Sequence, residues 1–281
     1  MNQVTLSLRN QSLDLCSRVH IMGILNVTPD SFSDGGQFTT EDAIMQAAGR
    51  MIQEGADIID IGGESTRPFA PPVTAEEEIK RVIPAINAIR QRYAIPISID
   101  TTKAKVATVA LDAGADIIND ISAMRFDPDM TRLASERHCP IIIMHMQGTP
   151  TDMQLKPSYS DVIQETILFF KDRIQALTES GIDRQQIIID PGIGFGKTLA
   201  HNLAILNHAA DYQVFGCPVL IGHSRKSFLC SLLGQDLEDR DLPTAVISGL
   251  LCQRQVAILR VHNVKGTYQA VHLAQAIANA Q

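Results

Sequence analysis

The feature that most constrains this sequence is a unit that recurs eight times, a short apolar run followed by a loop and an amphipathic stretch. The apolar runs are VHIMGILN (19–26), DIIDIGG (57–63), PISID (96–100), DIIND (116–120), PIIIMHM (140–146), IIIDPG (187–192), PVLIGHS (218–224) and VAILRVH (256–262). They are rich in Ile and Val without polar alternation, which is typical of strands buried on both faces of a parallel sheet.

Amphipathic segments such as 41–56, 75–91 and 161–181 separate these runs and predict helices. The phrases EGADIIDIG and AGADIINDI are near-copies, and each carries a helix-ending Gly into the next strand. Eight strand–helix units in about 250 residues match the number and size of a TIM (β/α)8 barrel. An open doubly wound sheet would normally have a glycine-rich dinucleotide turn after its first strand, and this sequence has none there.

We expect residues 1–281 to form a single α/β domain. The leading segment VTLSLRNQSLDL (4–15) alternates apolar and polar residues around a polar turn. This pattern predicts a β-hairpin within residues 1–18, ahead of a barrel at 19–281 and covering its N-terminal mouth.

Charge and cysteine content restrict the partners and the compartment. A formal net charge of -7 argues against a general nucleic-acid or anionic membrane surface. The five cysteines are scattered, without a C-x-x-C pair, which favours the cytoplasm. The first residues lack the pattern of a signal peptide, and no apolar stretch reaches the roughly 18 residues of a membrane span. We therefore expect a cytoplasmic protein that acts on small molecules.

Polar residues gather where the predicted strands end, which is where TIM barrels carry their catalytic groups. They are Asn26, Glu64, Thr66, Arg67, Asp100, Asn119, Asp120, His145, Asp190, Ser224, Arg225, Lys226, Arg260, His262 and Asn263. A single such residue would be read as a strand-end cap or salt bridge, but all eight runs contribute one. The set therefore predicts a functional site at the carboxyl end of the barrel.

This set divides by charge into two groups. Asp100, Asn119 and Asp190 can accept hydrogen bonds from an amino-substituted heterocycle, and the two carboxylates would stabilise a nearby cation. The second group suits a phosphate-type anion and comprises Arg67, Arg260, His262, Asn26 and Thr66. The predicted ligand thus has a donor-rich or cationic end and an anionic end.

Three other motifs fail on inspection. GIGFGKT (192–198) lacks the glycine spacing of a Walker or dinucleotide loop. GHSRK (222–226) ends in Lys226 where a nucleophile elbow needs Gly. His145 has no second His at helical spacing and no nearby Cys, which favours a packed strand-end histidine over a metal ligand.

Long motifs throughout the chain resemble those of the dihydropteroate synthase family of folate biosynthesis. They are MGILNVTPDSFSDGG (22–36), DIGGESTRP (60–68), ISIDTTK (97–103), IINDIS (117–122), MHMQGTP (144–150), DPGIGFGK (190–197), GHSRKSF (222–228) and RVHNV (260–264). The resemblance covers about residues 20–275 and implies a TIM barrel, in agreement with the repeat count. It also implies a homodimer and inhibition by sulfonamides, which mimic 4-aminobenzoate.

The reaction implied by this resemblance joins 6-hydroxymethyl-7,8-dihydropterin diphosphate to 4-aminobenzoate, giving 7,8-dihydropteroate and diphosphate. The pterin-binding residues would be Asp100, Asn119, Met144, Asp190, Gly222 and Lys226. The diphosphate contacts would be Asn26, Thr66, Arg67, Arg260 and His262, with Asn26 also ligating Mg²⁺. The aminobenzoate pocket would be framed by Phe32, Thr66, Pro68, Phe195, Lys226 and Ser227. The catalytic residues would be Asp100, Lys226, Arg260 and His262.

Dissociative chemistry suits these residues, because an electron-rich pterin attached to a CH₂ group can expel diphosphate and leave a delocalised cation. Such an enzyme must stabilise positive and negative charge and needs no nucleophilic triad. The turn-rich segment after Asn26, with Gly35 and Gly36 as hinge, is predicted to be a lid over the site, and the loop STRPFAPPV (65–73) to be its partner.

Two positions depart from the family pattern. Phe69 follows the GGESTRP motif, where the family usually has a small residue, and Asn263 stands where the family has Asp. Two alternative functions remain. A non-catalytic pterin-binding paralogue would usually lack Asp100, Lys226, Arg260 or His262, and all are present. Against a pterin-dependent methyltransferase, Arg67, Lys226 and the R-V-H segment at the last strand favour a diphosphate ligand.

Overall fold

A closed barrel of parallel strands forms the centre of the protein. The computed structural model describes residues 5–28, 40–65, 71–234 and 237–280. Within these ranges, an eight-stranded sheet has the order β8-β7-β6-β5-β4-β3-β10-β9. The strands are β3 (His20–Asn26), β4 (Ile58–Gly62), β5 (Ile97–Asp100), β6 (Ile117–Asp120), β7 (Ile141–Met144), β8 (Ile187–Asp190), β9 (Leu220–Ile221) and β10 (Ile258–Val261). A parallel bridge between Ile189 and Val219 joins the two edges of the sheet, so the predicted TIM barrel is confirmed.

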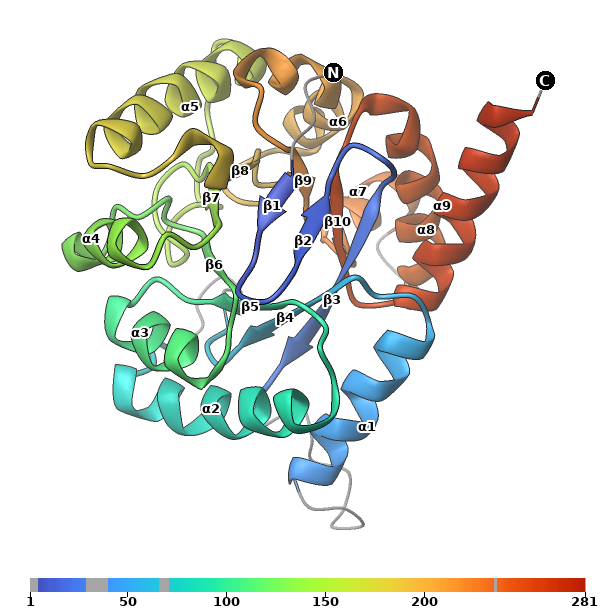
Figure 1. Ribbon diagram of the computed structural model, residues 1–281. Coiled ribbons are helices and arrows are strands. Elements are labelled where there is room, and N and C mark those ends of the chain that lie inside the picture. The colour runs from blue at the N-terminus through green and yellow to red at the C-terminus, as the bar shows by residue number, and fades with distance from the viewer. Residues whose placement is uncertain (1–4, 29–39, 66–70, 235–236, 281) are drawn as a thin grey trace.

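Helices surround this barrel (Figure 1). They are α1 (Thr40–Gln53), α2 (Ala75–Arg92), α3 (Ala104–Ala113), α4 (Pro128–Arg137), α5 (Val162–Glu179), α6 (Leu199–Asn207), α7 (Phe228–Leu233), α8 (Asp241–Leu251) and α9 (Val264–Asn279). Short 3₁₀ turns are η2 (Arg184–Gln186), η3 (Ala209–Phe215) and η4 (Cys252–Arg254). Among the described residues, no helix combines the length and apolar character needed to cross a membrane.

The near-copied phrases are structurally equivalent. Gly55 and Gly114 both have a left-handed backbone after a helix, with φ of 102° and 114°, which confirms their predicted helix-ending role. Asp57 and Asp116 follow two residues later, and each accepts a hydrogen bond from a backbone N–H of the neighbouring strand, β3 or β5. The repeat thus encodes how a helix ends and how the next strand enters the barrel.

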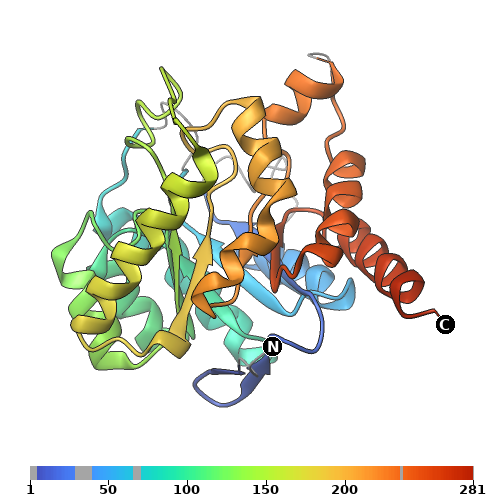
Figure 2. The same ribbon diagram turned by 90° about the horizontal axis from the view of Figure 1, so that it is seen from above.

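A hairpin covers the N-terminal end of the barrel. Strands β1 (Thr5–Ser7) and β2 (Ser12–Asp14) are antiparallel, and Leu6 pairs with Leu13. Figure 2 shows this hairpin below the barrel strands, at the bottom of the view. The hairpin and the strand bases share one buried apolar cluster, here called the apolar floor: Leu6, Leu15, Met22, Ile58, Ile117, Ile142, Ile188, Leu220, Ala257 and Ile258. The predicted cover of the N-terminal mouth is confirmed.

Strand periodicity places polar residues directly above the apolar floor. Successive side chains of a strand alternate between the two faces of the sheet, so the residue two positions after a floor residue faces the interior as well. For the floor residues from Met22 to Ile258 that lie in strands, these interior residues are Ile24, Asp60, Asn119, Met144, Asp190, Gly222 and Arg260. The intervening residues, such as Ile59 and Ile189, belong to the larger core between the sheet and the helices.

Candidate functional site

Arg260 is the centre of an ion-pair group inside the barrel. Its Nε donates to Asp60 Oδ2 at 2.6 Å, and its NH2 donates to Asp100 Oδ2 at 2.5 Å. Asn119 Nδ2 lies 3.3 Å from both carboxylate oxygens of Asp60. Strands β4, β5, β6 and β10 therefore bring one cation, two carboxylates and an amide to one point, and the two predicted charge groups meet there.

Asp60 is a residue that the sequence interpretation missed. It is fully buried and accepts the hydrogen bond from Arg260 Nε. A signal for it was present, because the near-copies EGADIIDIG and AGADIINDI align Asp60 with Asn119. The charge stands within the apolar run DIIDIGG, a pattern that by itself predicts only the interior of a strand.

Burial and neighbouring charges set the ionisation of this group. Burial raises the pKa of Asp100 to about 7, the charge of Arg260 opposes the rise, and Asp60 adds to it. Burial alone would lower the pKa of Arg260, but the charges of Asp60 and Asp100 raise it above its ordinary value. Arg260 is therefore a permanent cation, whereas Asp100 titrates near neutrality.

Asp190, at the end of β8, provides a third interior carboxylate. Its Oδ1 accepts a hydrogen bond from Gly192 N at 2.8 Å. Burial raises its pKa, while the hydrogen bond from Gly192 and the charge of Lys226 oppose the rise. A Cβ built on Gly222 would lie 3.5 Å from Asp190 Oδ2. Glycine at that position leaves the space beside the carboxylate open.

Lys226 reaches this group from the loop before α7. Its Nζ lies 4.0 Å from the centroid of the Phe195 ring, a distance typical of a cation–π contact. The pKa of Lys226 is lowered to about 8, because burial and the charge of Arg260 outweigh the opposing charges of Asp190 and Asp100. Ser227 follows Lys226 and is exposed.

Apolar side chains border the same region. Phe195 and Met144 belong to one buried cluster, whose members are Ile121, Met144, Met146, Met153 and Phe195. The predicted pterin contact Met144 and the predicted aminobenzoate contact Phe195 are therefore neighbours in one apolar wall.

His262 follows β10 and is held by a serine. Its Nδ1 lies 3.0 Å from Ser224 Oγ, and its backbone N–H donates to the same oxygen at 3.1 Å. Burial lowers the pKa of His262 to about 3, and the cations Arg225 and Arg260 add to this shift. The imidazole is neutral at pH 7 and can therefore donate one hydrogen bond and accept another.

The hydrogen-bond partners of the Asn263 side chain are Gly266 and Asp241. Its Oδ1 accepts from Gly266 N at 2.9 Å and caps α9, and its Nδ2 donates to Asp241 Oδ2 at 3.0 Å. Asp241 is in turn held by Arg225. The residue that holds His262 is therefore Ser224 rather than residue 263.

Asn263→Asp is accordingly expected to change kcat by less than about tenfold. Aspartate caps a helix as well as asparagine does, but its charge would face Asp241, so we expect a loss of stability of about 1 kcal/mol. Steady-state kinetics and thermal unfolding of both proteins measure the two effects. A loss of all activity with unchanged stability would contradict this account.

Asn26 ends β3 at the rim of the interior group. A Cβ built on Gly62 would lie 3.6 Å from Asn26 Oδ1 and 3.7 Å from Asp100 Oδ2. Glycine at position 62 therefore leaves the amide oxygen and the carboxylate on a shared open space. No cluster of three or more His, Cys, Asp or Glu suited to a metal occurs among the described residues.

Glu64 is turned toward the helices rather than toward the interior group. It accepts from Lys103 Nζ at 2.5 Å and from Val73 N at 2.8 Å. It therefore holds the base of the loop that follows β4. Several predicted residues lie outside the described part of the chain: Phe32, Gly35, Gly36, Thr66, Arg67, Pro68 and Phe69.

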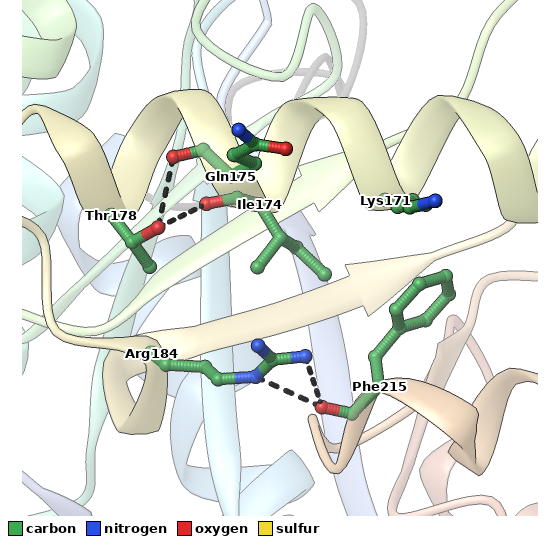
Figure 3. Close-up of a pocket in the computed structure, with 6 residues that line it drawn as sticks. All are labelled: Lys171, Ile174, Gln175, Thr178, Arg184 and Phe215. Atoms are coloured by element: carbon green, nitrogen blue, oxygen red, sulfur yellow. Dashed lines mark hydrogen bonds between the residues drawn. The ribbon is translucent and has the colours of Figure 1, made fainter.

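Two hollows lie elsewhere on the protein. One, of about 280 Å³, is bounded by Lys171 and Gln175 of α5 and by Arg184 and Phe215 (Figure 3). The other, of about 700 Å³, lies at the N-terminal end between the hairpin connection, η4 and α9. Neither includes any residue of the interior group.

Comparison with known proteins identifies relatives of this arrangement. Residues 22–262 match the family described as "Pterin binding enzyme". A dihydropteroate synthase from Synechocystis sp. is 45% identical over 269 residues, covering 94% of this chain and 92% of that protein. The dihydropteroate synthase of Escherichia coli is 43% identical over 270 residues, covering 96% of this chain and 95% of that protein.

Solved structures agree with these sequence relatives. A dihydropteroate synthase from Xanthomonas albilineans with 4-aminobenzoic acid has a TM-score of 0.93 at 42% identity and covers 100% of both chains. The same enzyme with 7,8-dihydropteroate has a TM-score of 0.89 at 40% identity, covering 99% of this chain and 100% of that one. A Yersinia pestis dihydropteroate synthase with a sulfonamide drug has a TM-score of 0.90 at 42% identity, covering 98% and 100%.

Proposed function

This chain belongs to the dihydropteroate synthase family of pterin-binding enzymes, and from that membership we propose which of its residues carry each part of the reaction. The enzyme condenses 6-hydroxymethyl-7,8-dihydropterin diphosphate with 4-aminobenzoate to give 7,8-dihydropteroate and diphosphate. The observation that carries the proposed roles is the interior group, in which Arg260 holds Asp60 and Asp100 above the apolar floor.

The pterin ring is proposed to bind against the deepest polar residues. Asp100, Asn119 and Asp190 supply acceptors for its N–H groups, and Met144 packs near its face. Gly222 leaves space beside Asp190 for the ring. The full proposed set is Asp100, Asn119, Met144, Asp190, Gly222 and Lys226.

Leaving-group stabilisation is assigned to the rim of the same group. Arg260 donates hydrogen bonds to anionic oxygens, and the neutral His262 donates one through Nε2 when Ser224 holds Nδ1 as an acceptor. The remaining proposed diphosphate contacts are Asn26, Thr66 and Arg67. As the C–O bond to diphosphate breaks, the carboxylates Asp100 and Asp190 stabilise the pterin cation, and Arg260 and His262 stabilise the anion.

Asn26 is also suited to be a ligand of Mg²⁺. Its amide oxygen shares open space with Asp100, and Mg²⁺ prefers oxygen ligands while taking most of its coordination from water and substrate phosphates. When bound, the ion would neutralise charge on the diphosphate as a Lewis acid. Asn26 would hold it at the rim, where the leaving group departs.

The aminobenzoate is proposed to enter last, against Phe195, Lys226 and Ser227. The Phe195 ring gives it an apolar wall, and the Lys226 ammonium is close to that wall. After the C–O bond to diphosphate has broken, the lone pair of its amine forms the C–N bond to the pterin CH₂, and the resulting ammonium releases one proton to water. Phe32, Thr66 and Pro68 complete the proposed pocket, and sulfonamides are expected to compete for it.

Diphosphate release by the purified enzyme tests these assignments. We expect release with the pterin diphosphate and Mg²⁺ to be coupled to dihydropteroate formation when 4-aminobenzoate is present, and to be lost in Arg260→Ala. Pterin binding without any product would favour the non-catalytic paralogue. In that case Phe69 and Asn263 would be the first residues to replace by the family's usual ones, a small residue and Asp.

A bell-shaped pH profile of kcat/KM is expected, with limbs near pH 7 and pH 8. The carboxylate form of Asp100 increases as pH rises through about 7, because its pKa is raised to that value. The ammonium form of Lys226 is lost as pH rises through about 8. Lys226→Arg should remove the alkaline limb, since arginine stays charged. A profile that is flat from pH 6 to 9 would contradict both roles.

A homodimer is proposed to form through α8 and α9, which lie side by side (Figure 1). Large apolar side chains are exposed there: Leu242, Val246, Leu250, Leu273 and Ile277. Such a patch is typical of a protein–protein interface. Analytical ultracentrifugation should show a dimer for the wild type and a monomer for the double variant Val246→Glu, Leu273→Glu.

We also propose that residues 1–281 form one domain and that the protein is located in the cytoplasm.

A further inference from the structure

Lys197 is a buried lysine that none of the roles above uses. Its side chain is 3% exposed, and its Nζ donates to Phe195 O at 3.0 Å and to His145 O at 3.3 Å. The same Nζ lies 3.0 Å from His145 Nδ1. Burial lowers the pKa of Lys197 to about 7, against the charge of Asp190. The protonated form has three N–H donors, and these three acceptors satisfy all of them.

The imidazole of His145 is suited to accept this hydrogen bond. Burial lowers the pKa of His145 to about 2, and the charge of Lys197 adds to the shift, so the ring is neutral. The ring packs edge-on against Phe169 at 4.9 Å between centroids. His145 is thus the packed strand-end residue that was predicted, and it serves Lys197 as a fixed acceptor.

The segment from Asp190 to Lys197 is packed tightly against the chain that follows β7. Gly192, Gly194 and Gly196 all have positive φ, a conformation that other residues rarely adopt. A Cβ on Gly192 would lie 2.0 Å from His145 O, and one on Gly196 would lie 2.6 Å from Gln147 O. The backbone of residues 192–196 is therefore in close contact with the backbone of residues 145–147.

Phe195 lies between these glycines and is fixed at its own carbonyl. Lys197 Nζ joins that carbonyl to the carbonyl of His145, so the cation links the loop after β8 to the end of β7. On the other side, the Phe195 ring faces the Lys226 ammonium at 4.0 Å. Lys197 therefore acts on the wall of the site without reaching the site itself.

We propose that Lys197 is a positioning residue for 4-aminobenzoate, because its buried ammonium fixes Phe195 against the end of β7 and so sets the wall on which the aminobenzoate ring lies. This proposal rests on the assignment of Phe195 to the aminobenzoate pocket. It predicts a selective effect, because Lys197 Nζ is hydrogen-bonded to the carbonyl of Phe195, whereas it acts on the pterin acceptor Asp190 only through its charge.

A purely structural role predicts a different result. Lys197→Met removes the cost of desolvating a charge but leaves the carbonyls of Phe195 and His145 and the Nδ1 of His145 without their donor, so the free energy of unfolding should fall. A lysine that serves only stability should leave both Michaelis constants of the folded variant unchanged. A positioning role predicts that the KM for 4-aminobenzoate changes far more than the KM for the pterin diphosphate.

The experiment compares full-length Lys197→Met with Lys265→Met, the same substitution at an exposed lysine of α9. We expect Lys197→Met to raise the KM for 4-aminobenzoate about tenfold or more. The KM for the pterin diphosphate and kcat at saturation should change less than about threefold, and Lys265→Met should match the wild type. Equal changes in both KM values, or none, would overturn the proposal.

Phe195→Ala tests the link between the two residues. If Lys197 acts through Phe195, adding Lys197→Met to Phe195→Ala should raise the KM for 4-aminobenzoate no further, because coupled residues are not additive. Full additivity would show that Lys197 acts by another route. If Phe195→Ala alone leaves this KM unchanged, the assignment of Phe195 is wrong and the proposal fails with it.

Folding is checked by circular dichroism and thermal unfolding of each variant. Should Lys197→Met fail to fold, Lys197→Gln replaces it, because its amide can still donate to one carbonyl and should give a smaller rise in the same KM. If neither variant folds, Lys197 is required for folding and its role as a positioning residue is rejected.

Discussion

Arg260→Ala is expected to lower kcat/KM by at least about 10³-fold, the largest effect of any substitution considered. Arg260 is the only cation that contacts both Asp60 and Asp100 among the described residues, and Asp60 is fully buried. Its removal takes away a proposed diphosphate donor and also raises the pKa of Asp100, because its charge opposes that rise. Steady-state kinetics with both substrates measure the loss.

Stability should fall as well, by about 3–5 kcal/mol, because removing one partner of a buried ion pair leaves the other uncompensated. Arg260→Lys separates the two effects. It keeps the charge but cannot donate in a fixed fork to two carboxylates, so we expect more stability than in Arg260→Ala with activity still strongly reduced. Arg50→Ala, at an exposed position of α1, is the matched control. Near-normal turnover by Arg260→Ala would contradict the proposed leaving-group role.

Lys226→Met is expected to lower kcat/KM by about 10²–10³-fold, the second largest effect. The Lys226 charge lowers the pKa of Asp190, so methionine should leave that carboxyl more protonated. It also removes the cation above the Phe195 ring. Since Lys226 serves both proposed ligands, the KM for each substrate should rise.

This result would differ from that of Lys197→Met, for which only one KM is expected to change. Isothermal titration with a pterin ligand and kinetics with varied 4-aminobenzoate give the two affinities for Lys226→Met, and Lys265→Met again serves as the control. If only the KM for 4-aminobenzoate changed, the assignment of Lys226 to the pterin site would be wrong.

The strands could be predicted because each carries its own signal. The run PISID, for example, gives β5 at Ile97–Asp100, and the copied phrases gave the helix ends at Gly55 and Gly114. Strand β9 is shorter than the run PVLIGHS suggested, since it spans Leu220–Ile221, and Val219 before it forms a single bridge to Ile189. The last residues of that run, which include His223 and Ser224, form the loop after β9.

Contacts between distant residues could not be read in the same way. Arg260 meets Asp60 across 200 residues and Asp100 across 160 residues of sequence. The sequence placed Arg260 and Asp100 at one end of the barrel, but their charges assigned them to different ends of the ligand. Which side chains pair depends on strand order and stagger, and these appear only when the barrel closes.

Asp60 was within reach of sequence reasoning and was still missed. Its alignment with Asn119 in the copied phrases implied the same interior position two residues above the floor. Lys197 was harder to interpret. Its motif was tested against phosphate-binding loops and rejected, and only the folded chain reveals that its ammonium serves two carbonyls and an imidazole.

The apolar floor gives the barrel a blind end, and this bears on the order in which molecules travel. Leu6 and Leu15 of the hairpin region complete a buried layer beneath Asp60, Asn119 and Asp190. Both substrates and both products must then pass through the opposite opening. If the pterin occupies the deepest residues, an aminobenzoate that arrived first would obstruct its path, so the pterin diphosphate should bind first. Dihydropteroate should leave through the same opening, and its pterin end should leave last.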